Sequence, residues 1–436
     1  MNLNANRYAT HMAVRSRIAV KRWRRRALFV AGGLAVGAAA VLMAVLADGA
    51  QRLFFDLLKH WRYAALIVTP AGFALAAYAA QTVFPNSQGS GIPQVIAALH
   101  LEEPEARAPL VSLRVGLGKI ALLTLGLLCG ASSGREGPTV QVGASLMFAI
   151  GRFSPYRQAG FVLAGAAAGV AAAFNTPLAG IVFGIEELSR SFEAKASGLI
   201  VGAIIAAGLT SLALVGDYSY FGSTSATLPL GREWAAIVAL AVVGGLGGAL
   251  FSKIVVAFGN SASRAGRFVR ANPILFAALC GLGVAMCGLG GDISVFGTGY
   301  EQARSIVHGE QSVDLWFGPL KFVASVLSAV SGIPGGIFSP SLSIGAGLAP
   351  VAALVFHTAP IGALALIGMV AYLTGVLQAP ITAFVIVSEM TNDHAMVIPL
   401  MMAALIANAA SKSVSRQGLY HLLARNFMGG HASAER

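Results

Sequence analysis

Four short segments of the chain combine glycine with an apolar continuation, and three of them also contain proline. Proline suits the first turn of a helix, because the N–H group that it lacks would have no partner there. Glycine just before the helix lets backbone N–H groups turn toward a ligand. A helix start of this kind presents free N–H donors and the positive end of the helix dipole, so it attracts anions without a full positive charge. The segments are Gly89-Ser90-Gly91-Ile92-Pro93, Gly134-Arg135-Glu136-Gly137-Pro138, Gly336-Ile337-Phe338-Ser339-Pro340 and Gln417-Gly418-Leu419-Tyr420.

Partial charges of this kind suit transport better than permanent binding. A buried lysine would hold an anion too tightly to release it, whereas dipoles compensate the lost hydration and still let the anion leave. Glu136 is the one carboxylate within the four segments. Acids are favoured in the first turn of a helix, so Glu136 taken alone is equally explained as a helix cap. The segments therefore predict an anion site and leave the role of Glu136 open at this point.

The composition of the chain places these segments in a membrane. Of the 436 residues, 56% are hydrophobic and only 11% are charged, and the mean hydropathy is +0.74. Soluble domains carry about 25% charged residues, so an ordinary soluble protein is excluded. Several apolar stretches match the roughly twenty residues that cross a bilayer, while shorter ones such as 140–152 indicate helices that stop at a binding site inside it. We predict an all-α polytopic membrane protein.

Much of the formal net charge of +12 lies near the N-terminus. The basic cluster directly precedes the apolar run 27–47, as a cytoplasmic flank does under the positive-inside rule. A signal peptide also begins with basic residues, but this run is longer than a signal core and many more follow it. We interpret residues 1–26 as a cytoplasmic tail before a retained first span, and we expect no nucleic-acid partner. The basic residues are Arg15, Arg17, Lys21, Arg22, Arg24, Arg25 and Arg26.

An ordered set of residues recurs in the second half of the chain, at an offset of 202 to 203. Lys119 precedes Pro138 by 19 residues, and Lys321 precedes Pro340 by the same number. In both copies a further proline follows, with a glutamate nine residues after it, at Pro177 and Glu186 and at Pro380 and Glu389. Chance explains one match but not the ordered set. We therefore predict a duplication with halves at about 85–215 and 290–425. The sequence does not distinguish parallel from inverted copies, and we favour inverted ones because they bring equivalent loops to a shared site near the midplane.

These segments resemble the motifs of the CLC family of chloride channels and transporters. The similar residues are 89–93, 134–138, 336–340 and Tyr420, together with the long stretch Ala164–Leu188. Similarity extends from about 85 to 425. The resemblance implies the CLC-type fold, with many tilted and re-entrant helices in two inverted repeats. The transmembrane domain would cover 27–425, followed by a tail at 426–436 and no cytosolic regulatory domain.

The resemblance implies a role for each matching residue. Ser90 and Tyr420 would donate their hydroxyl groups to a central chloride from opposite sides, and the N–H groups of Ile337 and Phe338 would complete this site. Glu136 would be the gate and proton acceptor, because its carboxylate mimics the anion at a helix start and protonation removes the attraction. The supporting residues would be Gly134, Arg135, Gly137, Pro138 and Lys119, with Arg135 structural rather than ion-binding.

Lys119 matches an intramembrane lysine of bacterial relatives, where it raises the local potential. In some of those relatives carboxylates follow the first motif, whereas Gln94 and Ile96 stand there in this chain. The charge partner of Lys119 therefore stays open.

Glu187 matches the inner proton glutamate of the family's exchangers, which the channels typically lack. An acid inside a membrane is costly unless it is solvated or protonated, so it marks a functional candidate. The pair Glu186-Glu187 also fits the end of a span, and Glu186 would have at most a supporting role. With both acids present, protons would pass between Glu187 and Glu136 while anions follow the Ser90 route. We predict chloride transport in exchange for protons, with a passive channel of the same family as the alternative.

Other activities find less support in the residues. Ser90 favours chloride over nitrate, because proline at this position accompanies nitrate preference in the family, and fluoride-specific relatives alter motifs that are intact here. No nucleophile–base or metal constellation appears, so we expect neither an intramembrane enzyme nor a metal or cofactor.

The resemblance also implies a homodimer with one pathway per subunit. We expect a multi-pass protein of the cell (inner) membrane with both termini cytoplasmic. The cysteines, Cys129, Cys280 and Cys287, fit neither a disulfide framework nor a metal site.

Overall fold

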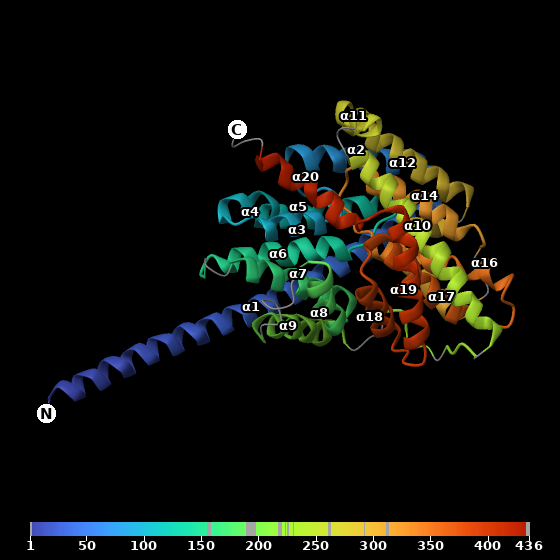
Figure 1. Cartoon of the computed structure of the whole chain (residues 1–436). Coiled ribbons are helices and arrows are strands. Elements are labelled where there is room, and N and C mark those ends of the chain that lie inside the picture. Colours follow the sequence, from blue (N-terminus) through green and yellow to red (C-terminus); the bar gives the residue numbers. More distant parts are fainter. Residues whose placement is uncertain are drawn as a thin grey trace.

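The computed structural model of the chain is almost entirely helical (Figure 1). It describes residues 2–154, 158–188, 198–216, 220–222, 224, 226–229, 231–259, 263–291, 293–310 and 314–432. Within these residues no strand is formed, and β-type pairing is limited to isolated bridges that join Gly89 to Pro334 and Gly134 to Gly336. The prediction of an all-α chain is confirmed.

The helices of the first half of the chain are α1 (Asn2–His60), α2 (Ala65–Thr82), α3 (Ile92–His100), α4 (Pro104–Val111), α5 (Leu113–Leu128), α6 (Glu136–Gly151), α7 (Gln158–Phe174), α8 (Pro177–Glu186) and α9 (Gly198–Val215). Those of the second half are α10 (Ala235–Gly259), α11 (Arg264–Ala271), α12 (Pro273–Gly290), α13 (Tyr300–Val307), α14 (Phe317–Val330), α15 (Phe338–Ala346), α16 (Ala349–Ala353), α17 (Ile361–Leu377), α18 (Pro380–Thr391), α19 (Val397–Val414) and α20 (Leu419–Ala432). Short 3₁₀ turns are η1 (Arg62–Ala64), η3 (Arg232–Trp234) and η4 (Ile293–Val295).

Long and short apolar helices occur in successive groups along the chain. Seven helices in the described residues are long and apolar enough to cross a bilayer, and shorter apolar helices lie between them. Helices α3 and α15 have nine residues each, which corresponds to about 14 Å of rise, roughly half of a hydrocarbon core. Their ends therefore fall inside the thickness that the long helices cross. The chain is a multi-pass membrane protein.

Helix α1 differs from the expected division into a tail and a first span. It runs unbroken from Asn2 to His60, and Figure 1 shows it projecting from the helical body. The sequence from 1 to 31 contains no glycine or proline to end a helix, so the helix of the apolar span extends back through the basic segment. At the other terminus, the predicted tail at 426–436 begins inside α20, which continues to Ala432; residues 433–436 lie outside the described residues.

Two long apolar stretches are each split into two helices at equivalent places. Asn175 separates α7 from α8 with a φ of 56°, and Gln378 separates α17 from α18 with a φ of 57°. A proline begins the following helix in both copies, at Pro177 and Pro380. Proline disfavours helical geometry in the residue before it and suits the first turn after it, so the chain turns at these points.

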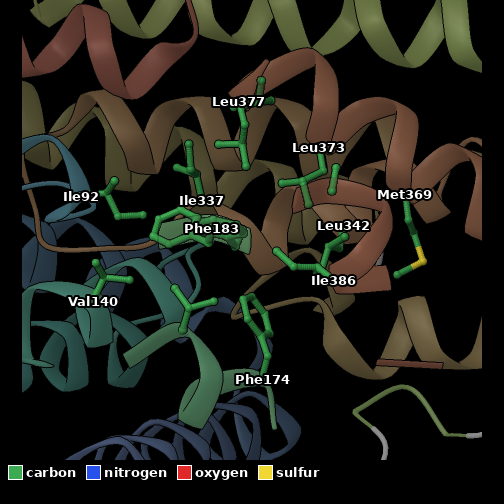
Figure 2. Close-up of a cluster of buried hydrophobic side chains, with 14 of the residues drawn as sticks. Ile92, Val140, Phe174, Phe183, Ile337, Leu342, Met369, Leu373, Leu377 and Ile386 are labelled. Atoms are coloured by element: carbon green, nitrogen blue, oxygen red, sulfur yellow. The ribbon is translucent and has the colours of Figure 1, made fainter. Parts of the chain in front are cut away.

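Buried side chains from both halves form the core around the predicted site. Figure 2 shows side chains of both halves in one cluster, with Ile92 of α3 and Val140 of α6 on its left and Leu373 of α17 and Ile386 of α18 on its right. Small residues let the neighbouring backbones approach. A Cβ added at Gly143 would lie 2.3 Å from the carbonyl oxygen of Gly165, and one added at Gly345 would lie 2.4 Å from that of Gly368. The same close contact thus recurs in both halves.

The duplicated residues also make reciprocal contacts. The backbone N–H groups of Leu178 and Ala179 donate to the Glu389 carboxylate, at 3.1 and 2.9 Å. In return, those of Ile381 and Thr382 donate to the Glu186 carboxylate, at 3.2 and 2.6 Å. Each half therefore supplies an acid that caps the first turn of a helix in the other half. Such an exchange is what a two-fold axis between the repeats produces.

Candidate functional site

The N-termini of α6 and α15 meet at a bridge between two glycines. Gly134 and Gly336 exchange two backbone hydrogen bonds of 2.7 Å each, and α6 begins two residues after the first glycine, α15 two after the second. The first N–H groups of a helix have no intrahelical partner. Those of Ile337 and Phe338 lie at the start of α15, opposite the start of α6 at Glu136. Two positive helix ends therefore face the same small volume.

Ser90 and Tyr420 lie together although 330 residues separate them. Their hydroxyl oxygens are 3.5 Å apart, and both side chains are buried. Ser90 precedes α3, where Gly91 turns the chain with a φ of 92°, and Tyr420 lies in the first turn of α20. A Cβ added at Gly137 would lie 2.3 Å from the Ser90 hydroxyl oxygen, so the first turn of α6 contacts this pair. The two hydroxyl groups can donate to one anion.

The Glu136 carboxylate is fully buried and is held by two hydroxyl groups. Its Oε1 accepts hydrogen bonds from the hydroxyl of Tyr220, at 3.1 Å, and from that of Ser339. Its Oε2 has no hydrogen-bond partner within the described part of the chain. Hydroxyl donors of this kind stabilise a carboxylate in its charged form. Glu136 therefore lies inside the site, held by hydroxyl groups, rather than as a helix cap exposed to solvent.

Sequence reasoning missed both of these donors. Ser339 lies in the motif 336–340. In the duplication Phe338 is equivalent to Glu136, so Ser339 follows the residue that corresponds to the gate, and this position could have drawn attention to it. Tyr220 lies between α9 and α10, outside every motif, and no local pattern marks it.

Arg135 is held by α1. Its Nη1 lies 2.6 Å from the Asp48 carboxylate and 3.1 Å from the Ala44 carbonyl oxygen. Its guanidinium also lies 5.9 Å from the centre of the Tyr220 ring, a cation–π distance. These contacts fix the residue before α6 to the first long helix, as a structural role requires. Asp48 is a partner that sequence reasoning did not find.

Lys119 donates to backbone carbonyl oxygens rather than to a carboxylate. Its Nζ lies 2.9 Å from the carbonyl oxygen of Gly89 and 3.3 Å from that of Gln88. Gln94 also donates to the Gln88 carbonyl oxygen, at 2.7 Å. Both side chains therefore hold the loop that carries Ser90. Lys321 does the same in the second half, donating to the carbonyl oxygens of Val295 and Gly297 at 2.9 and 2.7 Å.

Glu187 lies at the C-terminus of α8 and is buried. Its Oε1 is 3.3 Å from Nδ1 of His421, which follows Tyr420 directly in α20. His421 was not predicted from the sequence. An imidazole ring can both donate and accept a proton, so a histidine in contact with a carboxylate is suited to proton transfer.

Aromatic rings join these parts. The Phe338 ring lies 6.1 Å from the Tyr420 ring and 5.7 Å from the Phe174 ring, which lies in turn 5.8 Å from the Tyr220 ring. The two carboxylates are thus connected through neighbouring residues: Glu136 contacts Ser339, Phe338 packs on Tyr420, and Glu187 contacts the residue after that tyrosine.

A cavity of about 430 Å³ opens beside the Glu136 end of this arrangement. Its lining comes from α1, α7, α9 and α13, together with Arg135 and Tyr220. Charged side chains of both signs line it, and Glu136 itself is not among the lining residues. The charged lining residues are Asp48, Arg52, Arg135 and Glu301.

Known proteins resemble the chain over most of its length. The protein called H(+)/Cl(-) exchange transporter ClcA from Citrobacter koseri is 31% identical over 398 residues, which cover 83% of this chain and 80% of that protein. The protein of the same name from Klebsiella pneumoniae subsp. pneumoniae is 30% identical over 400 residues, covering 83% and 79%.

Solved structures share the fold at lower identity. A slow cyanobacterial Cl⁻/H⁺ antiporter superposes with a TM-score of 0.80 at 21% identity, over 94% of this chain and 99% of that one. A CLC-type fluoride/proton antiporter gives 0.77 at 21% identity, over 92% and 98%. The predicted CLC-type fold is confirmed. Residues 71–412 match the family described as voltage gated chloride channel, and the chain therefore belongs to the CLC family.

Proposed function

We propose that the chain exchanges chloride for protons across a membrane, with Glu136 as its gate. The observation that carries this proposal is the buried Glu136 carboxylate at the N-terminus of α6, beside a pair of buried hydroxyl groups on Ser90 and Tyr420. A carboxylate at a helix start imitates a bound anion, and protonation removes its charge and its attraction. The ClcA relatives are named as H(+)/Cl(-) exchange transporters, which also supports exchange.

Chloride would bind between the hydroxyl groups of Ser90 and Tyr420 and the N–H groups of Ile337 and Phe338. Partial charges would replace its hydration shell without trapping it. Gly134, Gly137 and Pro138 would keep the start of α6 close to this site, and Arg135 and Lys119 would hold the two loops that supply it.

Protons would reach Glu136 by way of Glu187. The latter is buried, and a buried acid in a membrane protein needs a partner to be tolerated. His421 contacts it at 3.3 Å, so it would hand protons between solvent and Glu187. Anions and protons would then share the Glu136 end of the pathway and separate at Phe338 and Tyr420.

The proposed function also includes the location of the protein and its assembly. The protein would lie in the cell (inner) membrane with both termini in the cytoplasm, because the basic residues flank the first span. It would work as a homodimer with an independent pathway in each subunit. It would need no metal or cofactor, bind no nucleic acid and catalyse no covalent reaction.

Simultaneous recording of chloride and proton flux in liposomes tests the proposal. The purified wild type should move both ions, while Glu136→Gln and Glu187→Gln should lose proton movement and retain some chloride transport. Both variants keep the size of the side chain and remove only the group that titrates. Proton movement that survives in Glu187→Gln would remove that residue from the pathway.

A passive channel is the second candidate, because the family that matches residues 71–412 is described as voltage gated chloride channel. In that case the wild type would carry chloride down its gradient with no proton movement. The same recording therefore separates the two functions.

A further inference from the structure

Tyr220 stands between the gate and the cavity. Its ring lines the cavity of about 430 Å³, while its hydroxyl group donates to the Glu136 carboxylate at 3.1 Å. Glu136 is fully buried and does not line the cavity. Tyr220 is therefore a side chain that touches both the cavity and the gate.

The Tyr220 ring is fixed on several sides. It packs edge-on against the rings of Phe174, Phe221 and Tyr300, at 5.8, 5.3 and 4.7 Å. The Arg135 guanidinium lies over it at 5.9 Å. The neighbouring backbone is anchored too, since the Phe221 N–H donates to the Met390 carbonyl oxygen at 3.2 Å. A hydroxyl group on a ring held in this way keeps its direction, and it is aimed at the gate.

Ser339 reaches the same carboxylate oxygen from α15. Two hydroxyl groups from different parts of the chain thus converge on Oε1 of Glu136. A hydroxyl group makes a stronger hydrogen bond to a charged carboxylate than to a neutral one. A protonated carboxylic acid is neutral and donates a hydrogen bond itself, so the two hydroxyl groups bind it less strongly.

We propose that Tyr220, assisted by Ser339, is the positioning residue that latches the ionised Glu136 in the anion site and sets the pH at which the gate is released. This inference rests on the proposed function of Glu136 and adds its regulation. Loss of a latching hydroxyl group destabilises the ionised carboxylate. Protonation then occurs at a lower proton concentration, and the gate opens at higher pH.

Several other charged and titratable groups surround Glu136. On its own segment Arg135 precedes it and is paired with Asp48 of α1. From α20 the Tyr420 phenol faces the site. In the cavity beyond Tyr220 lie Arg52 of α1 and Glu301 of α13. A Tyr220→Phe substitution leaves all of these in place, because it removes one oxygen and keeps the ring.

The test is the pH dependence of chloride transport by the full chain in liposomes. Tyr220→Phe should shift the midpoint of the transport-against-pH curve upward by about one to two pH units, the change expected for one lost hydrogen bond to a charged group. Ser339→Ala should shift it in the same direction. Tyr300→Phe is the matched control, because its ring packs on Tyr220 while its hydroxyl group lies 3.5 Å from Arg304 and not at the gate. Its midpoint should equal that of the wild type.

A double variant tests whether Tyr220 acts through the Glu136 carboxylate. In a Glu136→Gln background the latch has no carboxylate to hold, so adding Tyr220→Phe should leave the pH curve unchanged. An unchanged midpoint in both Tyr220→Phe and Ser339→Ala, in a wild type that exchanges chloride for protons, would overturn the latch alone. Absence of exchange in the wild type would instead overturn the proposed function. If Tyr220→Phe does not fold, Ser339→Ala decides the outcome.

Discussion

Gly134 and Gly336 each donate a backbone hydrogen bond to the carbonyl oxygen of the other, at 2.7 Å in both directions. They are equivalent residues of the duplication, 202 positions apart. Their exchange ties the starts of α6 and α15 together at the axis between the repeats. The two anion-attracting helix ends thus belong to one rigid junction, and the gate stands on one side of it.

Gly134→Ala should displace the gate carboxylate. A Cβ added at Gly134 would lie 2.4 Å from Oε2 of Glu136, closer than real contacts allow, so either the side chain or the junction must shift. We expect weaker latching of Glu136 and chloride transport that persists at higher pH than in the wild type. Recording chloride efflux against pH measures this.

Gly126→Ala is the control for that variant. A Cβ added there would have its nearest neighbour at 3.6 Å, an ordinary contact, and alanine also favours the helix. Its transport should match that of the wild type. A Gly134→Ala variant that behaves like Gly126→Ala would contradict the close packing of the gate against the junction.

Tyr420→Phe should weaken chloride binding at equilibrium. The substitution keeps the ring that packs on Phe338 at 6.1 Å and removes the hydroxyl group that faces Ser90. A hydrogen bond to a charged partner contributes about 1.5 kcal/mol or more, so the dissociation constant should rise roughly tenfold. Titration calorimetry on the purified protein checks this. Tyr372→Phe serves as the control, because its hydroxyl group is buried in the core without a partner in the described residues.

His421→Gln should slow proton movement while chloride binding stays intact. His421 lies 3.3 Å from Glu187, and glutamine retains a polar group there but cannot titrate. We expect fewer protons per chloride in coupled flux. His60→Gln, an exposed histidine at the end of α1, should leave the ratio unchanged. Wild-type stoichiometry in His421→Gln would exclude the histidine as a relay.

The motifs of the sequence predicted the residues that carry an anion site, because helix starts are encoded locally by glycine and proline. The resemblance of these motifs to those of the CLC family singled out Ser90 and Tyr420, and their hydroxyl oxygens lie 3.5 Å apart. The duplication placed Glu186 and Glu389 at equivalent distances from a proline, but it did not predict that each would cap a helix of the other half. These roles remain predictions, but the geometry brings the residues together.

The partners of these residues could not be predicted, because they come from distant parts of the chain. Tyr220 lies 84 positions from Glu136, Ser339 lies 203 from it, and Asp48 lies 87 from Arg135. Tyr220 and Asp48 lie outside every motif, whereas Ser339 lies inside one. The partner of Lys119 was unreadable for a different reason: its acceptors are backbone carbonyl oxygens, which every residue carries and no residue type reveals.

The most direct test of the central claim is uphill proton movement driven by chloride. Liposomes that contain the purified wild type are loaded with high chloride, diluted into low chloride at equal pH, and followed with a pH electrode outside. Exchange predicts that chloride leaving the liposomes drives protons inward, so the external solution becomes more alkaline until a protonophore collapses the difference. Chloride efflux at a constant external pH before the protonophore is added would contradict the account.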